Sequence, residues 1–255
     1  MNILVISGLD PSGGAGFVAD ARMIDARGGR PVGVVTALTV QDTRGVREVH
    51  PCSAEVLSDQ LRALLSDLPV AAVKIGMLGS QAIALAVADA LELTRAPVVW
   101  DPVLRSSLGG AALFVGDAAV AATALKPHVT VATPNATEAA ALSGRAVTTV
   151  ADARAVATLL CRALGDAVLI TGGHLAAGDE VVDVLAEGDV ITELRAERID
   201  GATEVHGTGC ALSSALAVEL GRGTALPEAV RIARDEVVRR LRAPVTPGRG
   251  SRAVL

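Results

Sequence analysis

Aromatic residues are almost absent from this chain of 255 residues, which has two phenylalanines, one tryptophan and no tyrosine. Proteins that bind single-stranded nucleic acid stack its bases on aromatic rings, so this composition excludes a stacking platform. Positive charge is also in short supply, because 23 Lys and Arg face 28 Asp and Glu, for a formal net charge of −5. A nucleic-acid partner requires basic residues to neutralise its phosphates. We therefore expect no nucleic-acid partner.

Cysteine and long hydrophobic runs are scarce as well. The three cysteines, Cys52, Cys161 and Cys210, lie far apart in the sequence and lack metal-ligand spacing. An odd, sparse set of this kind is typical of a reducing cytosol. The N-terminus has no basic region of a signal peptide, and no apolar run approaches the ~18 residues that a membrane helix needs. We expect a soluble, cytoplasmic protein without a membrane partner.

Apolar residues are abundant, at 51% of the chain, and suffice for one large core. Short apolar runs alternate with segments of helical periodicity from residue 3 to residue 170. This alternation predicts an α/β fold with a mainly parallel sheet covered by helices on both faces. The expected strands are residues 3–6, 32–38, 71–75, 97–100, 129–132 and 167–170, followed by a hairpin of residues 180–186 and 190–194. Residues 1–242 then form a single domain, and the Pro/Gly/Arg-rich residues 243–255 are expected to form a flexible tail.

One stretch combines glycines with the start of an expected helix. Gly207 and Gly209 flank Thr208, and Cys210 opens an apolar run that continues to Leu220. Glycine lets backbone N–H groups approach a ligand closely, and a helix N-terminus adds unpaired donors and the positive end of its dipole. The stretch predicts a pocket for a phosphate, or for the charge that develops as a phosphoryl group moves. The alternative is a simple turn capped by threonine.

A second glycine-rich loop follows the first expected strand. Residues 8–16 read Gly-Leu-Asp-Pro-Ser-Gly-Gly-Ala-Gly, which is typical of a loop that approaches a ligand. Gly-x-Gly-x-x-Gly does not occur here, and no acidic residue lies at the required distance after a second strand. A dinucleotide site is therefore not expected. A plain β–α turn is the alternative interpretation.

Polar residues follow several expected strands at their carboxyl ends, where parallel sheets collect ligands. Gln41 has an amide that both donates and accepts, so it could recognise a heterocycle or lie in a solvated turn. Asp101 could face a metal or phosphate, or cap a turn. Asn135 and Glu138 have capping-box spacing, and the same pair could hold a hydrated Mg²⁺. The shared location favours a binding site at this edge.

Seven short motifs occur in an order that resembles the hydroxymethylpyrimidine/phosphomethylpyrimidine kinases of thiamine biosynthesis, in the ribokinase superfamily. They are residues 8–16, 36–43, 74–78, 101–103, 133–138, 172–174 and 206–210, within a resemblance that runs from residue 3 to about 242. The Asp-Pro-Ser-Gly-Gly-Ala-Gly loop and Gly-Thr-Gly-Cys are the most specific. The resemblance implies a ribokinase-like αβα three-layer sandwich, a homodimer, and transfer of the γ-phosphoryl of Mg-ATP to 4-amino-5-hydroxymethyl-2-methylpyrimidine and then to its monophosphate.

The resemblance also implies a role for each matching residue. The pyrimidine would contact Gly8, Asp20, Gln41 and Met77. The metal would be held by Asp101 and Glu138, and the nucleotide would lie against Asn135, Thr171 and Gly173. The backbone of Gly207, Thr208 and Gly209 would form the anion hole. Cys210 occupies the place of the Asp base of sugar kinases, and a helix N-terminus is expected to lower its pKa and supply a thiolate base.

Two positions depart from the family pattern. Thr171 stands where better-known members carry a lysine expected to touch the ATP phosphates, and the loop after Asp101 lacks a further lysine near Ser107. Arg105, on that loop, is our candidate for one replacement phosphate contact, and Lys74 is a second cation that could compensate. Two other functions stay open at this point: a pyridoxal kinase of the same superfamily, and a non-catalytic pyrimidine or phosphate sensor.

Overall fold

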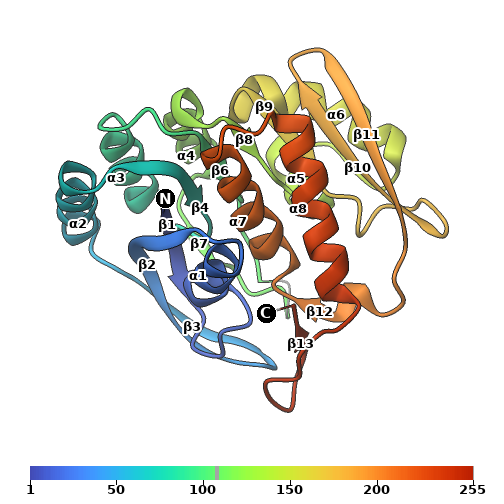
Figure 1. Ribbon diagram of the computed structural model, residues 1–255, viewed down its shortest axis with the longest axis horizontal. Coiled ribbons are helices and arrows are strands. Elements are labelled where there is room, and N and C mark those ends of the chain that lie inside the picture. The colour runs from blue at the N-terminus through green and yellow to red at the C-terminus, as the bar shows by residue number, and fades with distance from the viewer. Residues whose placement is uncertain (107–108, 255) are drawn as a thin grey trace.

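The computed structural model describes residues 1–106 and 109–254, and nine of the strands in these ranges form one sheet (Figure 1). Its strands are β1 (Asn2–Leu9), β2 (Arg30–Asp42), β3 (Gly45–Pro51), β4 (Val70–Ile75), β6 (Val98–Trp100), β8 (Val131–Ala132), β9 (Ala167–Ile170), β10 (Glu180–Glu187) and β11 (Val190–Glu197). Their order in the sheet is β11-β10-β9-β8-β6-β4-β1-β2-β3. The pairs from β9 through to β2 are parallel, whereas β3 and the β10–β11 hairpin pair antiparallel. The predicted mainly parallel sheet is confirmed.

Helices cover both faces of the sheet, as Figure 1 shows. One face carries α1 (Gly16–Ala26), α7 (Thr208–Gly221) and α8 (Leu226–Leu241), which pack on Ile3 and Val5 of β1. The other carries α2 (Ala54–Asp67), α3 (Gln81–Leu91), α4 (Ala118–Leu125), α5 (Ala136–Ser143) and α6 (Val150–Leu164), which pack on Leu4 and Ile6. Successive residues of a strand point to opposite faces, so the apolar residues of β1 contribute alternately to the two hydrophobic cores. The αβα three-layer sandwich is thereby confirmed.

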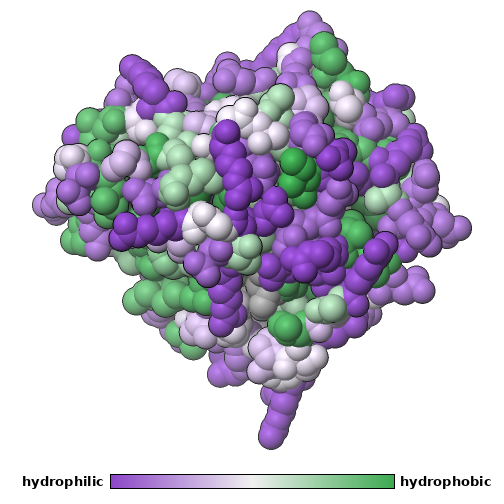
Figure 2. All heavy atoms as spheres, viewed as in Figure 1, coloured by the Kyte–Doolittle hydropathy of each residue, from purple (hydrophilic) through white to green (hydrophobic). Residues whose placement is uncertain are grey.

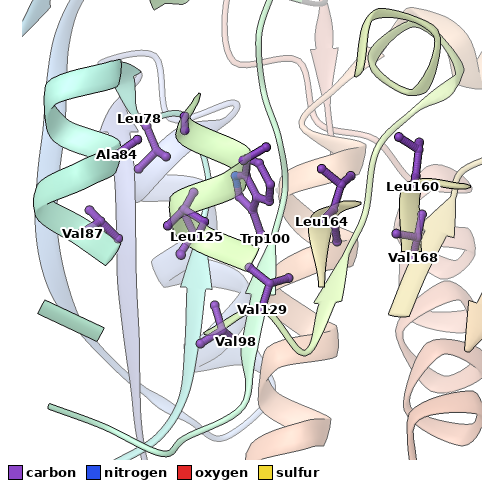
Figure 3. Close-up of a cluster of buried hydrophobic side chains, with 14 of the residues drawn as sticks. Leu78, Ala84, Val87, Val98, Trp100, Leu125, Val129, Leu160, Leu164 and Val168 are labelled. Atoms are coloured by element: carbon purple, nitrogen blue, oxygen red, sulfur yellow. The ribbon is translucent and has the colours of Figure 1, made fainter. Parts of the chain in front are cut away.

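The core on the α2–α6 side fixes the end of β6. Figure 3 shows the indole of Trp100 among aliphatic side chains that include Leu125 of α4 and Leu164 of α6. Trp100 is buried at the last position of β6. Side chains from several elements pack around Trp100 and fix its position. The position of Asp101, the first residue after β6, is therefore fixed as well.

Several elements were not expected from the sequence. Helix α4 is missed because it is short and alanine-rich, although Asp117 caps it by accepting from Ala119 N. The strand β3 turns β2 into a long hairpin, and four two-residue strands occur as well: β5 (Gly79–Ser80), β7 (Phe114–Val115), β12 (Val205–His206) and β13 (Arg252–Ala253). None of the helices in the described ranges combines the length and hydrophobicity that crossing a bilayer requires.

The residues after 242 return to the body of the protein. β13 pairs in parallel with β12, and Val254 is buried in the same cluster as Val5 and Val205. Residues 252–254 therefore pack against the body of the protein, and the domain boundary at residue 242 stays a prediction. The Pro/Gly/Arg-rich composition of residues 243–255 suggests a flexible tail. It does not show that the glycines allow this backbone to pack closely against another part of the chain. The mobility of the segment in solution stays a prediction.

Candidate active site

The two glycine-rich loops of the sequence touch each other. Gly207 precedes α7 with φ +83°, and a Cβ placed on it would lie 2.1 Å from the carbonyl oxygen of Gly14. Any side chain at this position would be strained and would clash, so glycine is required. The backbone N–H of Gly16 is also close enough to the sulfur of Cys210 to act on the pKa of the thiol. The loop of residues 8–16 and the start of α7 therefore share one site at the carboxyl end of β1.

Asp10 shapes the first glycine-rich loop. Its Oδ1 accepts from the backbone and the hydroxyl of Ser12 at 2.8 and 2.7 Å, and its Oδ2 accepts from the Ala15 amide at 3.0 Å. His206 Nε2 lies 3.5 Å from the same Oδ2. Desolvation acts to raise the pKa of Asp10, but the hydrogen bonds from His206 and Ser12 hold it below its usual value. This role was not predicted from the sequence, although an Asp side chain commonly accepts from the backbone two residues further on in a turn.

Three of the predicted pyrimidine contacts gather in one corner. A Cβ on Gly8 would lie 2.8 Å from Met77 Sδ, so the two residues are in contact. Met77 is buried in a cluster with Ala37 and Leu113, and Val46 of β3, which pairs in register with Gln41, packs against that cluster. The side-chain oxygen of Gln41 lies 3.2 Å from the Thr39 hydroxyl. The corner formed by Gly8, Met77 and Gln41 could hold a flat heterocycle.

Asp20 does not belong to this corner. Its side chain is fully buried; Oδ2 accepts from Lys74 Nζ at 2.7 Å and Oδ1 from the Ser214 hydroxyl at 2.8 Å. Both carboxylate oxygens of Asp20 are thus used inside the core, and its contact with the pyrimidine stays a prediction. Lys74 is fully buried too, so it cannot supply the missing cation at an ATP phosphate. Instead the pair lies beneath the start of α7.

The ionisation of Cys210 differs from the expectation. Desolvation, together with the carboxylates of Asp20 and Asp101, raises the pKa of the thiol to about 12, and the opposing effects of Lys74 and the Gly16 amide are smaller. These surroundings disfavour the thiolate of Cys210 in the free protein, and its role as a base stays a prediction. A cysteine on the first turn of a helix can be recognised from the sequence, but the buried carboxylates near it in space cannot.

Two buried carboxylates lie on the other side of α7. A Cβ on Gly209 would lie 3.5 Å from Asp101 Oδ2, and the Ser213 hydroxyl is 3.4 Å from the same oxygen. Desolvation raises the pKa of Asp101 to about 6. Desolvation and the charge of Asp101 raise the pKa of Glu138 to about 8. The two acidic residues predicted to bind a metal thus interact with each other.

The capping box at Asn135 is present as the sequence suggested. The side chain of Asn135 accepts from the Glu138 amide at 3.0 Å, and Glu138 Oε2 accepts from the Asn135 amide at 2.9 Å. The box leaves Glu138 Oε1 outside these bonds. Asn135 also bridges to Thr171, whose amide donates to Pro134 O at 3.0 Å. The structure thereby brings Asn135, Glu138 and Thr171 together.

The acidic pair fits a magnesium ion. In the described residues no group of three or more His, Cys, Asp and Glu side chains could hold a metal by itself. Mg²⁺ does not require one, since it is usually bound through one or two carboxylates together with phosphate oxygens and water. Asp101 and Glu138 are buried acids whose ionised forms are disfavoured by their surroundings. A cation bound between them would relieve that penalty.

The loop that contains Gly173 is fixed by hydrogen bonds with the side chains of Asp183 and Arg198. Asp183 accepts from the Gly172 amide at 2.5 Å and pairs with Arg234 of α8 at 2.5 Å. Arg198 donates to the Gly173 carbonyl at 2.9 Å. No atom lies within 4 Å of a Cβ placed on Gly173, so this residue borders open space. The loop is fixed and leaves room for a ligand.

Arg105 is not brought to the other site residues by its contacts. Its side chain is exposed and Nη1 donates to Gly110 O at 3.0 Å, within its own loop. Ser107, near which the sequence lacks a family lysine, lies outside the described residues. The proposed phosphate contact of Arg105 stays a prediction.

Comparison with known proteins adds the following. A family model described as phosphomethylpyrimidine kinase matches residues 10–254. The chain is 42% identical to a hydroxymethylpyrimidine/phosphomethylpyrimidine kinase of Rhizobium meliloti, over 91% of this chain and 86% of the relative. It is 40% identical to one of Streptomyces coelicolor, over 97% and 91%. Among solved structures, phosphomethylpyrimidine kinase from Clostridium difficile aligns with TM-score 0.80 and 31% identity, over 94% of this chain and 98% of that one. An ADP complex of Bacillus subtilis pyridoxal kinase aligns with TM-score 0.88 and 29% identity, over 99% and 96%.

Proposed function

The chain belongs to the phosphomethylpyrimidine kinase family, and we propose that it transfers the γ-phosphoryl group of ATP to 4-amino-5-hydroxymethyl-2-methylpyrimidine and then to the resulting monophosphate. It is a phosphotransferase with the ribokinase-like fold of its relatives. The observation that carries the proposal is the contact of Gly207 with Gly14, because it joins a phosphate-binding helix start to the loop that borders the pyrimidine corner.

The acceptor binds in the corner of Gly8, Met77 and Gln41. The Gln41 amide hydrogen-bonds the pyrimidine, because its NH2 group can donate to a ring nitrogen while its carbonyl oxygen accepts from the amino group. Met77 provides an apolar, adaptable surface for the ring face. The hydroxymethyl group then points toward Cys210, which the Gly16 amide joins to the same loop.

Phosphoryl transfer depends on positioning and charge stabilisation more than on covalent catalysis. The backbone N–H groups of residues 207–210, at the positive end of the α7 dipole, stabilise the charge on the moving group. Asp101 and Glu138 would hold Mg²⁺, which when bound neutralises phosphate charge. Because desolvation and nearby carboxylates raise the pKa of Cys210, we assign its thiol to orienting the acceptor hydroxyl, and the hydroxyl proton passes to the transferred phosphate.

The nucleotide lies on the β8–β9 side of the site. Asn135 and Thr171 are neighbours there, and Gly173 borders open space. Thr171 offers a hydroxyl in place of the family lysine, which removes one positive charge from the phosphates. Arg105, on the loop after Asp101, supplies a replacement cation in this proposal.

The test is direct. Purified protein with Mg-ATP and the hydroxymethylpyrimidine should yield ADP and, by mass spectrometry, first the monophosphate and then the diphosphate. The Glu138→Gln variant is a matched control, since glutamine can still accept in the capping box but loses the charge; it should fold and turn over slowly. Absence of any phosphorylated pyrimidine with the wild-type protein would contradict the proposal.

Pyridoxal phosphorylation is a second candidate. The pyridoxal kinase of Staphylococcus aureus, solved with AMP-PCP and pyridoxal, aligns with TM-score 0.87 at 27% identity. Both acceptors are hydroxymethyl-bearing aza-aromatic rings. Comparing kcat/KM for the two alcohols under the same Mg-ATP concentration separates the candidates, and we expect the pyrimidine to be preferred.

We further propose a homodimer in the cytoplasm. Figure 2 shows hydrophobic side chains gathered at the lower left, over the region of β2 and β3 in Figure 1. Leu38 and Val40 of β2 are 51% and 44% exposed. Exposed apolar side chains gathered near the edge of a sheet are typical of a protein interface. The three cysteines are free, which fits a reducing compartment.

A further inference from the structure

The end of the chain pairs with the segment that leads into the anion-binding loop. We call residues 245–254 the C-terminal strap. Its strand β13 runs parallel to β12, with Arg252 opposite Val205 and Ala253 opposite His206. The Val254 amide donates to His206 O at 3.2 Å. The strap therefore fixes the backbone of Val205 and His206, the two residues that precede the Gly207–Cys210 turn.

The strap also packs on the first glycine-rich loop. The Ala253 side chain lies 3.6 Å from a Cβ placed on Gly14, and Val254 Cγ2 lies 3.6 Å from a Cβ placed on Gly207. Ala253 and Val254 are 1% and 3% exposed. The strap therefore covers the junction where the two glycine-rich loops meet.

The other end of the strap holds the tip of the β2–β3 hairpin. The Gly250 amide donates to the Thr43 hydroxyl at 3.0 Å, and the Ser251 amide donates to Thr43 O at 2.8 Å. A Cβ on Gly250 would lie 2.0 Å from Thr43 O, so glycine is needed for this approach. Thr43 lies two residues beyond Gln41, at the turn between the two strands.

We propose that the C-terminal strap is a positioning element for phosphoryl transfer, which fixes the pyrimidine corner at Gln41 relative to the anion-binding loop at Gly207. This inference rests on the proposed function, because it assigns the strap to aligning the acceptor with the phosphoryl group. The β2–β3 hairpin lies at the edge of the sheet, and within residues 1–106 and 109–254 no strand pairs with the outer side of β3. The Thr39 hydroxyl ties the hairpin to Leu9 O at 2.8 Å, and the strap ties its tip to the phosphoryl-transfer loop.

The position of the strap predicts a selective effect. In the sheet, β9, which leads to Thr171 and Gly173, is separated from β2 by β8, β6, β4 and β1. Loosening the strap should therefore weaken acceptor binding and alignment, while leaving nucleotide binding intact. Small displacements of a reacting group cost large factors in rate, so kcat falls together with acceptor affinity. A segment that merely stabilised the fold would not produce this split.

The experiment compares two substitutions at one position in the full-length chain. Ser251→Pro removes the amide that donates to Thr43 O, whereas Ser251→Ala keeps it. We expect Ser251→Pro to raise the KM for the pyrimidine about fivefold, the size of one lost hydrogen bond, with the KM for ATP within about twofold of wild type. Ser251→Ala should match wild type in both. A folded Ser251→Pro protein with an unchanged pyrimidine KM, or with equal rises in both KM values, would overturn the proposal.

A second pair of variants keeps the test decisive if Ser251→Pro fails to fold. Thr43→Val removes the hydroxyl that accepts from Gly250, and Thr43→Ser retains it. Thr43→Val should raise the pyrimidine KM and Thr43→Ser should not. When both single variants fold, the double variant Thr43→Val/Ser251→Pro should show less than the product of the single effects, because both act on one contact. Independent, multiplying effects would count against the strap.

Hydrogen exchange separates failure of the strap from failure of the proposed function. The amides of residues 43–46 should exchange faster in Ser251→Pro than in Ser251→Ala, whichever acceptor the enzyme uses. If the wild-type protein phosphorylates no pyrimidine but this exchange difference appears, the substrate assignment fails and the contact stands. If the protein phosphorylates the pyrimidine and neither exchange nor KM responds, the strap proposal fails alone.

Discussion

The ammonium nitrogen of Lys74 lies 2.7 Å from a carboxylate oxygen of Asp20, and neither side chain is exposed to solvent. The pair links β4 to α1, and the Ser214 hydroxyl of α7 completes it. Burial alone favours a neutral amine, but the Asp20 charge raises the pKa of Lys74 above its usual value. A buried charge of this kind is tolerated because its partner is in contact. The three elements that carry the site are therefore joined beneath it.

Removing one member of this pair should be costly. Lys74→Met leaves the Asp20 carboxylate buried without its cation, and we expect a loss of about 3–5 kcal/mol in the free energy of unfolding, measured in urea. The double variant Lys74→Met/Asp20→Asn removes both charges and should regain part of that loss. Equal stability of the single and double variants would show that the charges are not coupled.

Cys210 should react slowly with alkylating reagents near neutral pH. Its pKa is raised to about 12 by desolvation and by nearby carboxylates, so little thiolate is present. In a Cys52→Ser/Cys161→Ser background, the rate of labelling by iodoacetamide should stay low at pH 7 and keep rising above pH 10. Rapid labelling at pH 7 would restore the thiolate base that the sequence suggested.

Glu138 should make the metal-free protein less stable as pH rises. Its pKa is raised from 4.5 to about 8, so the folded protein holds a proton that the unfolded chain releases. The stabilisation is complete below about pH 4.5 and is lost as pH rises through about 8. Thermal unfolding without Mg²⁺ should give a smaller decrease in melting temperature from pH 5 to pH 8.5 for Glu138→Gln than for wild type. Parallel curves would contradict the burial of a protonated Glu138.

The two glycines of the anion-binding loop should respond differently to alanine. Gly207→Ala forces a Cβ against Gly14 O at φ +83°, and should cost about 2 kcal/mol or more in stability. Gly209→Ala meets Asp101 at an ordinary 3.5 Å, so the fold should be retained. Its methyl group would still narrow the phosphate pocket, and kcat should fall. Measuring melting temperature and turnover for both variants tests the assignment, which a fully active Gly209→Ala enzyme would contradict.

Arg105 should affect the nucleotide and not the acceptor. If it supplies the cation that Thr171 does not, Arg105→Ala should raise the KM for ATP about tenfold, as expected for one charge-assisted contact. Arg105→Lys should recover part of the loss, since the charge is kept but the guanidinium geometry is not. An unchanged ATP affinity in Arg105→Ala would remove this role.

The sequence by itself determined the parallel part of the sheet and most of the helices on its two faces, and it predicts the edge at which a ligand would bind. These follow from local periodicity and from backbone demands that are visible residue by residue, as at Gly207 and at the Asn135–Glu138 capping box. The family resemblance also rested on contiguous motifs, and the match over residues 10–254 confirms it.

Only the tertiary structure decided which charged groups contact each other and where the C-terminal residues pack. Asp20 and Lys74 are 54 positions apart, and no local pattern shows that they pair in the core. The same holds for the carboxylates that raise the pKa of Cys210, and for Thr43 and Gly250, which are 207 positions apart. Desolvation and Coulomb interactions depend on neighbours in space, so a pKa or a positioning contact is determined by the assembled fold.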